Sequence, residues 1–368
     1  MCLEIPRRPK LTLTTAQGWR EFVDAPPVPD PPRLTVVQLE RMPGSDRERY
    51  DLIRRLHHAN LGPFETPAYL EFKRDAMLIL GSNVQDGTRL RPSFGLQGEA
   101  GTGKSTAAKL IGRDLWREQV RIFTELTAEG QVRVPVTKIS MKGSNTERAI
   151  NEALAVSYTG TAVGRGSAPA LDRFCRYARE VETVLIIVDD FHFLDKHDPE
   201  ATSNHFKGIA EEVPATFVFV GVGLAAMELW DTERLGLTPS LSQTARRWPL
   251  LTMDLAHIRT PEERKAWITL LHTIDDRIVL AKHEPGTLQD MAELLYEYSQ
   301  GHMQTLFDAI NQATYRAITT GTEQITEGIL EKLPWSKAAI VGREQILAER
   351  AEQQRKQRRA AALDGAGG

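Results

Sequence analysis

The chain has 368 residues, of which 41% are hydrophobic and 26% are charged, and its formal net charge is −3. This composition is typical of a folded globular protein with room for two or so domains, and the near-balanced charge neither requires nor excludes a nucleic-acid partner. Two cysteines far apart, Cys2 and Cys175, argue against a disulfide framework. With no apolar run of the ~20 residues that span a bilayer, we expect a cytoplasmic protein with no membrane partner.

The first part of the chain is predicted to be an extended Pro-rich arm, residues 1–43, because residues 24–33 hold five prolines. This arm is either a flexible, surface-lying segment or a partner-binding segment. Residues 44–91 predict two helices that pack on the following core. Ser45 with Glu48 forms a capping-box signature, and Thr66 places a hydroxyl cap before Pro67.

Residues 92–257 alternate short apolar runs with helical stretches. The runs at 93–98, 133–140, 183–190 and 215–223 are rich in β-branched and aromatic residues, and helical stretches lie between them. This pattern predicts an α/β domain with a parallel sheet covered on both faces.

Strand-like runs stop after about residue 258. Thr260, Pro261 and Glu263 predict the start of the first of four helices in residues 258–335, a small all-α domain. Residues 336–368 are predicted to be a charged, partly disordered tail, with a solvated helix as its ordered form. The basic run at 355–359 is either solvated or a nucleic-acid contact.

A phosphate-binding loop lies between a predicted strand and a predicted helix. Residues 98–105 read GEAGTGKS and fit G-x-x-x-x-G-K-[ST]. The glycines let backbone N–H groups turn toward phosphate, and the helix that follows presents its positive end to the same anion. The candidate nucleotide-binding residues are Gly98, Glu99, Ala100, Gly101, Thr102, Gly103, Lys104, Ser105 and Thr106.

Within this loop, Lys104 is expected to reach the β- and γ-phosphates, and the Ser105 hydroxyl is expected to bind Mg²⁺. The run VLIIVDD, residues 184–190, supplies the acidic partner at the end of a buried strand. Asp189 is the candidate Mg²⁺ ligand, and Asp190 is the candidate group that polarises the attacking water. Asp190 is also compatible with simply capping the next segment.

Charge compensation during ATP hydrolysis commonly comes from an arginine of a neighbour. Arg246 and Arg247 precede the apolar run of the expected fifth strand. They are either solvated residues at the start of that strand or groups at a subunit interface. Loops after the strand ends are expected to face a central channel for DNA. Lys138, Lys142 and Arg148, just after the second strand, are candidate DNA-phosphate contacts there, with a solvated surface as the alternative.

Several stretches together resemble AAA+ ATPases, and more narrowly the TniB/TnsC-type ATPases of bacterial transposons. They are ETPAYL, GEAGTGKST, VLIIVDDFHFL, EEVPATFVFVGV, QTARRWPLL and YSQGHMQTLFDAINQATYRAITTGTEQIT. The resemblance covers residues 45 to 335 and implies a three-layer P-loop core with a helical lid. It implies an ATP- and Mg²⁺-dependent switch that forms homo-oligomers on double-stranded DNA and recruits or activates a transposase. Arg247 then matches the arginine that acts on the adjacent subunit's ATP.

Three positions depart from the family pattern. Asp190 stands where glutamate is usual, Val222 stands where a polar γ-phosphate sensor is common, and Gln304 stands at the sensor position of the lid, where arginine is common. These departures predict slow hydrolysis. Two alternatives remain open, a signalling or defence ATPase that acts through protein–protein contacts and a nucleotide-gated scaffold with little turnover. The loop reads phosphates, so it does not distinguish ATP from GTP.

Overall fold

The computed structural model describes residues 4–6, 11–84, 91–141, 146–161, 167–191, 199–226, 230 and 248–364. The chain divides into two compact units. The α/β unit holds Arg8–Pro27 and Pro67–Asp254, and the helical unit holds Met1–Arg7, Val28–Thr66 and the chain from Leu255 onward. Each unit is therefore built from segments that are far apart in sequence.

The α/β unit is built on one parallel sheet of five described strands in the order β2-β3-β4-β1-β5. The strands are β1 Phe94–Gln97, β2 Val136–Ser140, β3 Leu185–Asp189, β4 Thr216–Gly221 and β5 Leu250–Thr252. The predicted parallel α/β class is confirmed.

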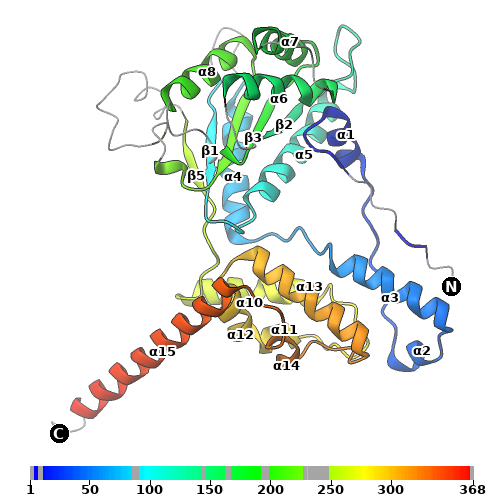
Figure 1. Cartoon of the computed structure of the whole chain (residues 1–368), viewed down its shortest axis with the longest axis vertical. Coiled ribbons are helices and arrows are strands. Elements are labelled where there is room, and N and C mark those ends of the chain that lie inside the picture. The colour runs from blue at the N-terminus through cyan, green and yellow to red at the C-terminus, as the bar shows by residue number, and fades with distance from the viewer. Residues whose placement is uncertain are drawn as a thin grey trace. The chain divides into compact units, whose positions relative to one another are not determined.

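Helices cover both faces of this sheet, as Figure 1 shows. Alternate residues of a strand point to opposite faces of a sheet, and those of β3 belong to two different apolar cores. Ile186 and Val188 pack with α6, α7 and α8, whereas Leu185 and Ile187 pack with α1, α4 and α5. The helices of this unit are α1 Ala16–Asp24, α4 Pro67–Ser82, α5 Lys104–Phe123, α6 Glu147–Thr159, α7 Ser167–Glu180, α8 Pro199–Glu212 and the 3₁₀ turn η2 Leu224–Ala226.

Residues 1–43 are not uniformly extended, which corrects the sequence prediction. Helix α1 begins after Thr15, whose side chain accepts a hydrogen bond from the Gly18 N–H, and it buries Trp19 completely. A second helix, α2 Val36–Glu40, has a capping box at Thr35. The five prolines of residues 24–33 all lie between these helices, so they exclude helix there and not on either side.

The helical unit contains α2, α3 and the helices of the C-terminal part, around its own apolar core. They are α3 Gly44–His58, α10 Pro261–Asp275, α11 Thr287–Asp290, α12 Ala292–Ser299, α13 Met303–Thr320, α14 Glu327–Leu330 and α15 Lys337–Asp364. The predicted capping box at Thr260 and Glu263 is present. That at Ser45 is absent, because α3 begins at Gly44 with Pro43 at the N-cap position, and Ser45 therefore lies inside the helix.

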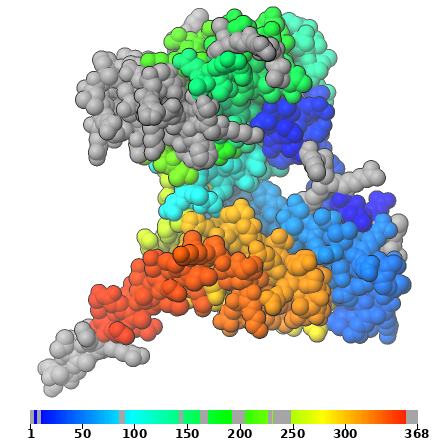
Figure 2. Space-filling view, in the orientation of Figure 1, coloured from blue at the N-terminus to red at the C-terminus, as the bar shows by residue number. Residues whose placement is uncertain are grey.

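Helix α3 packs on α13 and belongs to the helical unit, whereas α4 packs on α5 in the α/β unit. In Figure 2 the blue surface of α3 lies against the orange surface of α13. The prediction that both helices of 44–91 pack on the α/β core is therefore wrong for α3. The reason is a set of polar partners more than 200 residues away in sequence.

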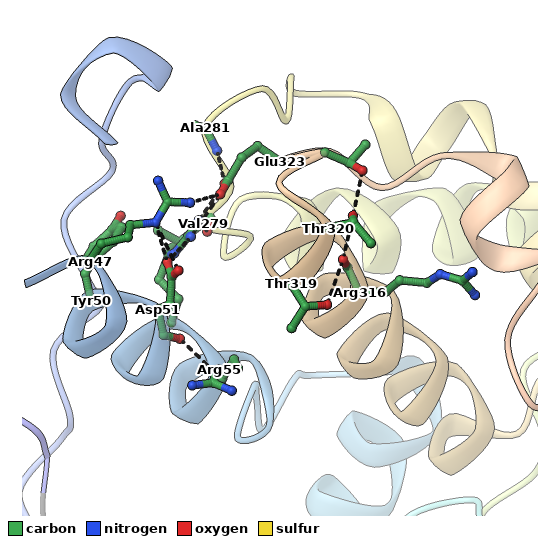
Figure 3. Close-up of polar contacts among 12 residues, drawn as sticks. Arg47, Tyr50, Asp51, Arg55, Val279, Ala281, Arg316, Thr319, Thr320 and Glu323 are labelled. Atoms are coloured by element: carbon green, nitrogen blue, oxygen red, sulfur yellow. Dashed lines mark hydrogen bonds and ion pairs between the residues drawn. The ribbon is translucent and has the colours of Figure 1, made fainter. Parts of the chain in front are cut away.

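These partners form a buried ion-pair network centred on Glu323 (Figure 3). Arg54 donates to Glu323 Oε2 at 2.6 Å, Arg47 donates to Oε1 at 2.8 Å, and the Ala281 N–H donates to Oε2 at 3.1 Å. The side chains of Arg54 and Glu323 are 1% and 4% exposed. Because every charge in the network has an opposite partner, α3 is fixed to the C-terminal helices.

The tail forms the helix α15, which packs on α12. Arg343 and Arg350 pair with Glu297 of α12 at 3.2 and 2.8 Å. Further along α15, Lys356 of the basic run at 355–359 pairs with Glu352 one turn earlier at 2.7 Å. None of the described helices is long and apolar enough to cross a membrane.

Candidate nucleotide-binding site

The phosphate-binding loop joins the end of β1 to the start of α5. Gly101 and Gly103 have φ angles of 79° and 99°, in the left-handed region that favours glycine. At Gly98 a Cβ atom would lie 2.2 Å from the Met253 carbonyl oxygen, so only glycine fits without a shift of the backbone. Gly103 caps α5, and Lys104 and Ser105 therefore occupy its first turn. The N–H groups of this turn have no partner within the helix and point toward the loop.

Lys104 lies across this loop. Its ammonium donates to the Glu99 carbonyl oxygen at 2.6 Å and contacts Thr102 Oγ1 at 3.5 Å. Burial lowers the pKa of Lys104, and the carboxylates of Asp189 and Asp190 partly offset this effect. A cation held inside the curve of the loop is placed to meet a phosphate.

The hydroxyl of Ser105 donates to Asp189 Oδ1 at 2.9 Å, although the two residues are 84 positions apart in sequence. Asp189 is the last residue of β3 and is 4% exposed. A serine hydroxyl beside a carboxylate is an oxygen donor pair of the kind that Mg²⁺ prefers. Among the described residues no group of three or more His, Cys, Asp and Glu could hold a metal by itself. The residues present thus fit a Mg²⁺ ion that is shared with phosphate oxygens.

Asp190 has a left-handed φ of 59°. Its N–H donates to Asp189 Oδ1 at 3.1 Å, and its Oδ2 accepts a hydrogen bond of 2.7 Å from the Ser140 hydroxyl. Its carboxylate is thus held beside Asp189, at the carboxyl edge of the sheet. The backbone strain at this position marks Asp190 as a residue held in place by its surroundings.

Lys138 differs in position from the sequence prediction, which placed it with a loop that faces DNA. It lies within β2, and its ammonium pairs with Asp189 Oδ2 at 2.8 Å. Its side chain is 13% exposed. Lys138 and Ser140 are therefore two residues of this site that sequence reasoning missed. Their spacing of two within β2 puts both side chains on one face, but only the register with β3 brings that face to Asp189.

The other predicted residues are dispersed. Arg148 lies on α6, where it is exposed and pairs with Glu152 at 2.9 Å. Gln304 lies on α13 of the helical unit and donates to Asp308 at 2.9 Å. Lys142 and Arg247 lie outside the described residues. Within the loop, Thr102 is buried and donates to the Glu99 carbonyl, and Thr106 is exposed.

The sheet order, the loop between β1 and α5 and the acidic end of β3 together define an AAA-type P-loop ATPase domain. Residues 91–226 match the protein family described as an AAA domain. No curated protein matches the sequence.

Solved structures of similar fold include three origin-recognition proteins. The ORC1 protein of Aeropyrum pernix in complex with DNA is 15% identical with a TM-score of 0.54, over 79% of this chain and 69% of that chain. The A. pernix ORC2 protein in ADPNP–ADP complexes is 16% identical with a TM-score of 0.56, over 79% and 72%. Drosophila ORC bound to DNA is 14% identical with a TM-score of 0.51, over 86% and 72%. At these identities the similarity is one of fold.

Proposed function

We propose that this protein is a Mg²⁺-dependent ATPase that assembles as a homo-oligomer on double-stranded DNA, selects a target site and recruits or activates a transposase. The observation that carries the ATPase part is the meeting of Lys104, Ser105 and Asp189 where β1, β3 and α5 converge. The narrower role in transposition rests on the resemblance to TniB/TnsC-type ATPases.

In this proposal each residue of the site has a distinct task. The loop amides and the start of α5 bind the phosphates, and Lys104 neutralises the β- and γ-oxygens. Ser105 and Asp189 hold Mg²⁺, which neutralises charge that develops on the transferred phosphoryl group. Asp190 orients the attacking water and accepts its proton, and Arg247 acts on the ATP of an adjacent subunit.

The DNA part of the proposal is supported by two structures of similar fold that are described as bound to DNA. In this chain Arg148 and Lys142 are the remaining candidates for phosphate contacts. Alanine at both positions should weaken DNA binding and reduce the dependence of binding on salt, by about one unit of logarithmic slope per lost contact. Unchanged affinity and slope would remove these residues from the interface.

The first experiment is ATP hydrolysis with and without double-stranded DNA, for the wild type and Lys104→Ala. Sedimentation in a slowly hydrolysed ATP analogue measures assembly in parallel. We expect DNA-stimulated hydrolysis and ATP-dependent assembly on DNA, both lost in Lys104→Ala. Hydrolysis and assembly that are indifferent to DNA would contradict the DNA part and leave the ATPase part intact.

A second candidate is a nucleotide-gated scaffold or signalling ATPase with little turnover, which acts through protein–protein contacts. The hydrogen bond from Ser140 to the short Asp190 side chain favours it, because that bond occupies a carboxylate oxygen that would otherwise be open to an attacking water. Tight ATP binding without measurable turnover, and assembly without DNA, would select this candidate.

A further inference from the structure

Both oxygens of the Asp189 carboxylate contact donor groups of the protein. Its Oδ1 accepts hydrogen bonds from the Ser105 hydroxyl at 2.9 Å and from the Asp190 N–H at 3.1 Å. Its Oδ2 pairs with the ammonium of Lys138 at 2.8 Å. A metal ion that binds this carboxylate therefore competes with a cation of the protein itself.

The register of β2 against β3 places Lys138 beside Asp189. Lys138 is paired with Ile187 across β2 and β3, and Ser140 is paired with Asp189. Lys138 and Asp189 are thus diagonal neighbours on one face of adjacent strands, within reach of a long side chain. Both are largely buried, with 13% and 6% of their side chains exposed. Water screens such a pair less than a surface pair, so its charge acts strongly on the site.

Two further lysines lie near Asp189, but Lys138 alone makes an ion pair with it within the described part of the chain. Lys104 is bonded to the Glu99 carbonyl oxygen. Lys109, one turn further along α5, has a pKa lowered by burial and by the charge of Lys138. Lys109 therefore provides a matched control, a cation in the same neighbourhood without a direct bond to Asp189.

We propose that Lys138 competes with Mg²⁺ for the carboxylate of Asp189 and so sets the Mg²⁺ concentration at which nucleotide binds tightly. This proposal rests on the proposed ATP binding and concerns the same site. Lys138 neutralises Asp189 where no metal does so, which removes a negative charge that repels phosphates. The lysine thus reduces the dependence of nucleotide affinity on Mg²⁺.

The test is equilibrium binding of a fluorescent, slowly hydrolysed ATP analogue across a series of free Mg²⁺ concentrations that starts in EDTA. Lys138→Met removes the charge and keeps much of the apolar stem. It should lower the half-saturating Mg²⁺ concentration on the order of tenfold, the scale of one charge-assisted hydrogen bond. It should also weaken binding in EDTA on the same order.

Lys138→Arg keeps the charge and should stay close to the wild type. Lys109→Met should change the Mg²⁺ midpoint much less than Lys138→Met. A Mg²⁺ midpoint and an EDTA affinity in Lys138→Met equal to those of the wild type would overturn the proposal while leaving ATP binding in place. A wild type that binds no nucleotide at any Mg²⁺ concentration would overturn the proposed function itself.

Thermal unfolding without nucleotide gives a readout that does not depend on activity. Lys138→Met leaves the buried Asp189 without its cation, so it should unfold at a lower temperature in EDTA. If this variant does not fold, Lys138→Gln, which donates a neutral hydrogen bond, replaces it in the binding test. A Mg²⁺ midpoint for Lys138→Gln equal to that of the wild type then counts against the proposal.

Discussion

Ser140, the last residue of β2, donates a hydrogen bond of 2.7 Å to Oδ2 of Asp190, the residue that follows β3. The hydrogen bond joins neighbouring strands and holds the carboxylate of Asp190, whereas Lys138 and Ser105 contact that of Asp189. How the Asp190 carboxylate is held thus depends on a residue 50 positions earlier in sequence.

Ser140→Ala should raise kcat for ATP hydrolysis several-fold, because it frees the Asp190 oxygen that the Ser140 hydroxyl occupies to bind the attacking water. Nucleotide affinity should change little. Steady-state hydrolysis and equilibrium binding measure the two effects separately. Asp190→Asn serves as the reference and should reduce kcat by about 100-fold or more while ATP still binds. A kcat unaffected by Asp190→Asn would show that Asp190 is not the base.

Gly98→Ala should damage both the fold and the site. The added methyl group meets the Met253 carbonyl oxygen at 2.2 Å, and neither backbone can move without disturbing β1 or the loop. We expect a loss of about 1–3 kcal/mol in the free energy of unfolding, together with weaker nucleotide binding. Denaturant titration and the binding assay measure these effects.

Gly208→Ala is the matched control for this change. A Cβ at this helical position of α8 meets nothing within 4 Å, and alanine favours helix over glycine. It should leave binding unchanged and stability equal or slightly higher. Equal stability loss in the two variants would show that contact with Met253 is not the cause.

Replacing only one partner of the Arg54–Glu323 ion pair should lower the free energy of unfolding. Glu323→Gln leaves the buried Arg54 with reduced compensation, and we expect a loss of about 3–5 kcal/mol in the free energy of unfolding. Arg54→Met combined with Glu323→Gln should cost less than the sum of the single changes. Additive losses would contradict direct coupling. Arg74→Met, at a surface pair with Asp75, is the control and should not change the unfolding curve measurably.

His58 should make the helical unit sensitive to mild acid. Burial, and then the charges of His57 and Arg54, hold the pKa of His58 well below its usual value. Its Nε2 accepts the Val279 N–H at 3.0 Å, which requires the neutral ring. The unfolded chain takes up a proton below about pH 6.5 and the folded chain does not. Stability should thus be full above that pH and fall by up to about 1.4 kcal/mol per pH unit below it.

His58→Gln removes the titrating ring and keeps an acceptor for the Val279 N–H. Urea unfolding of both proteins between about pH 7.5 and about pH 5.5 should show a steeper decline in the wild type. Parallel curves would contradict a neutral, buried His58.

The sequence was informative where the signal is local. The phosphate-binding loop is a contiguous motif between β1 and α5, and the apolar run before Asp189 predicts a buried strand. Neither Lys138 nor the assignment of α3 could be predicted in this way. Lys138 lies beside Asp189 because of the register of β2 and β3. Helix α3 belongs to the helical unit because its Arg54 pairs with Glu323, 269 residues later. Such contacts depend on tertiary pairing, which periodicity and composition do not contain.

The separation of Arg54 from Glu323 has a consequence for synthesis on the ribosome. At about 5–20 residues per second, the 269 residues between them take roughly 13–54 seconds to make. During that time the α/β unit can be completed, since it ends at Asp254, while α3 waits without its partner. Until then Arg54 lacks Glu323 and has Asp51 of the same helix as a partner, and the apolar face of α3 is unpaired. A chaperone that binds α3 early would act before the last helices are synthesised.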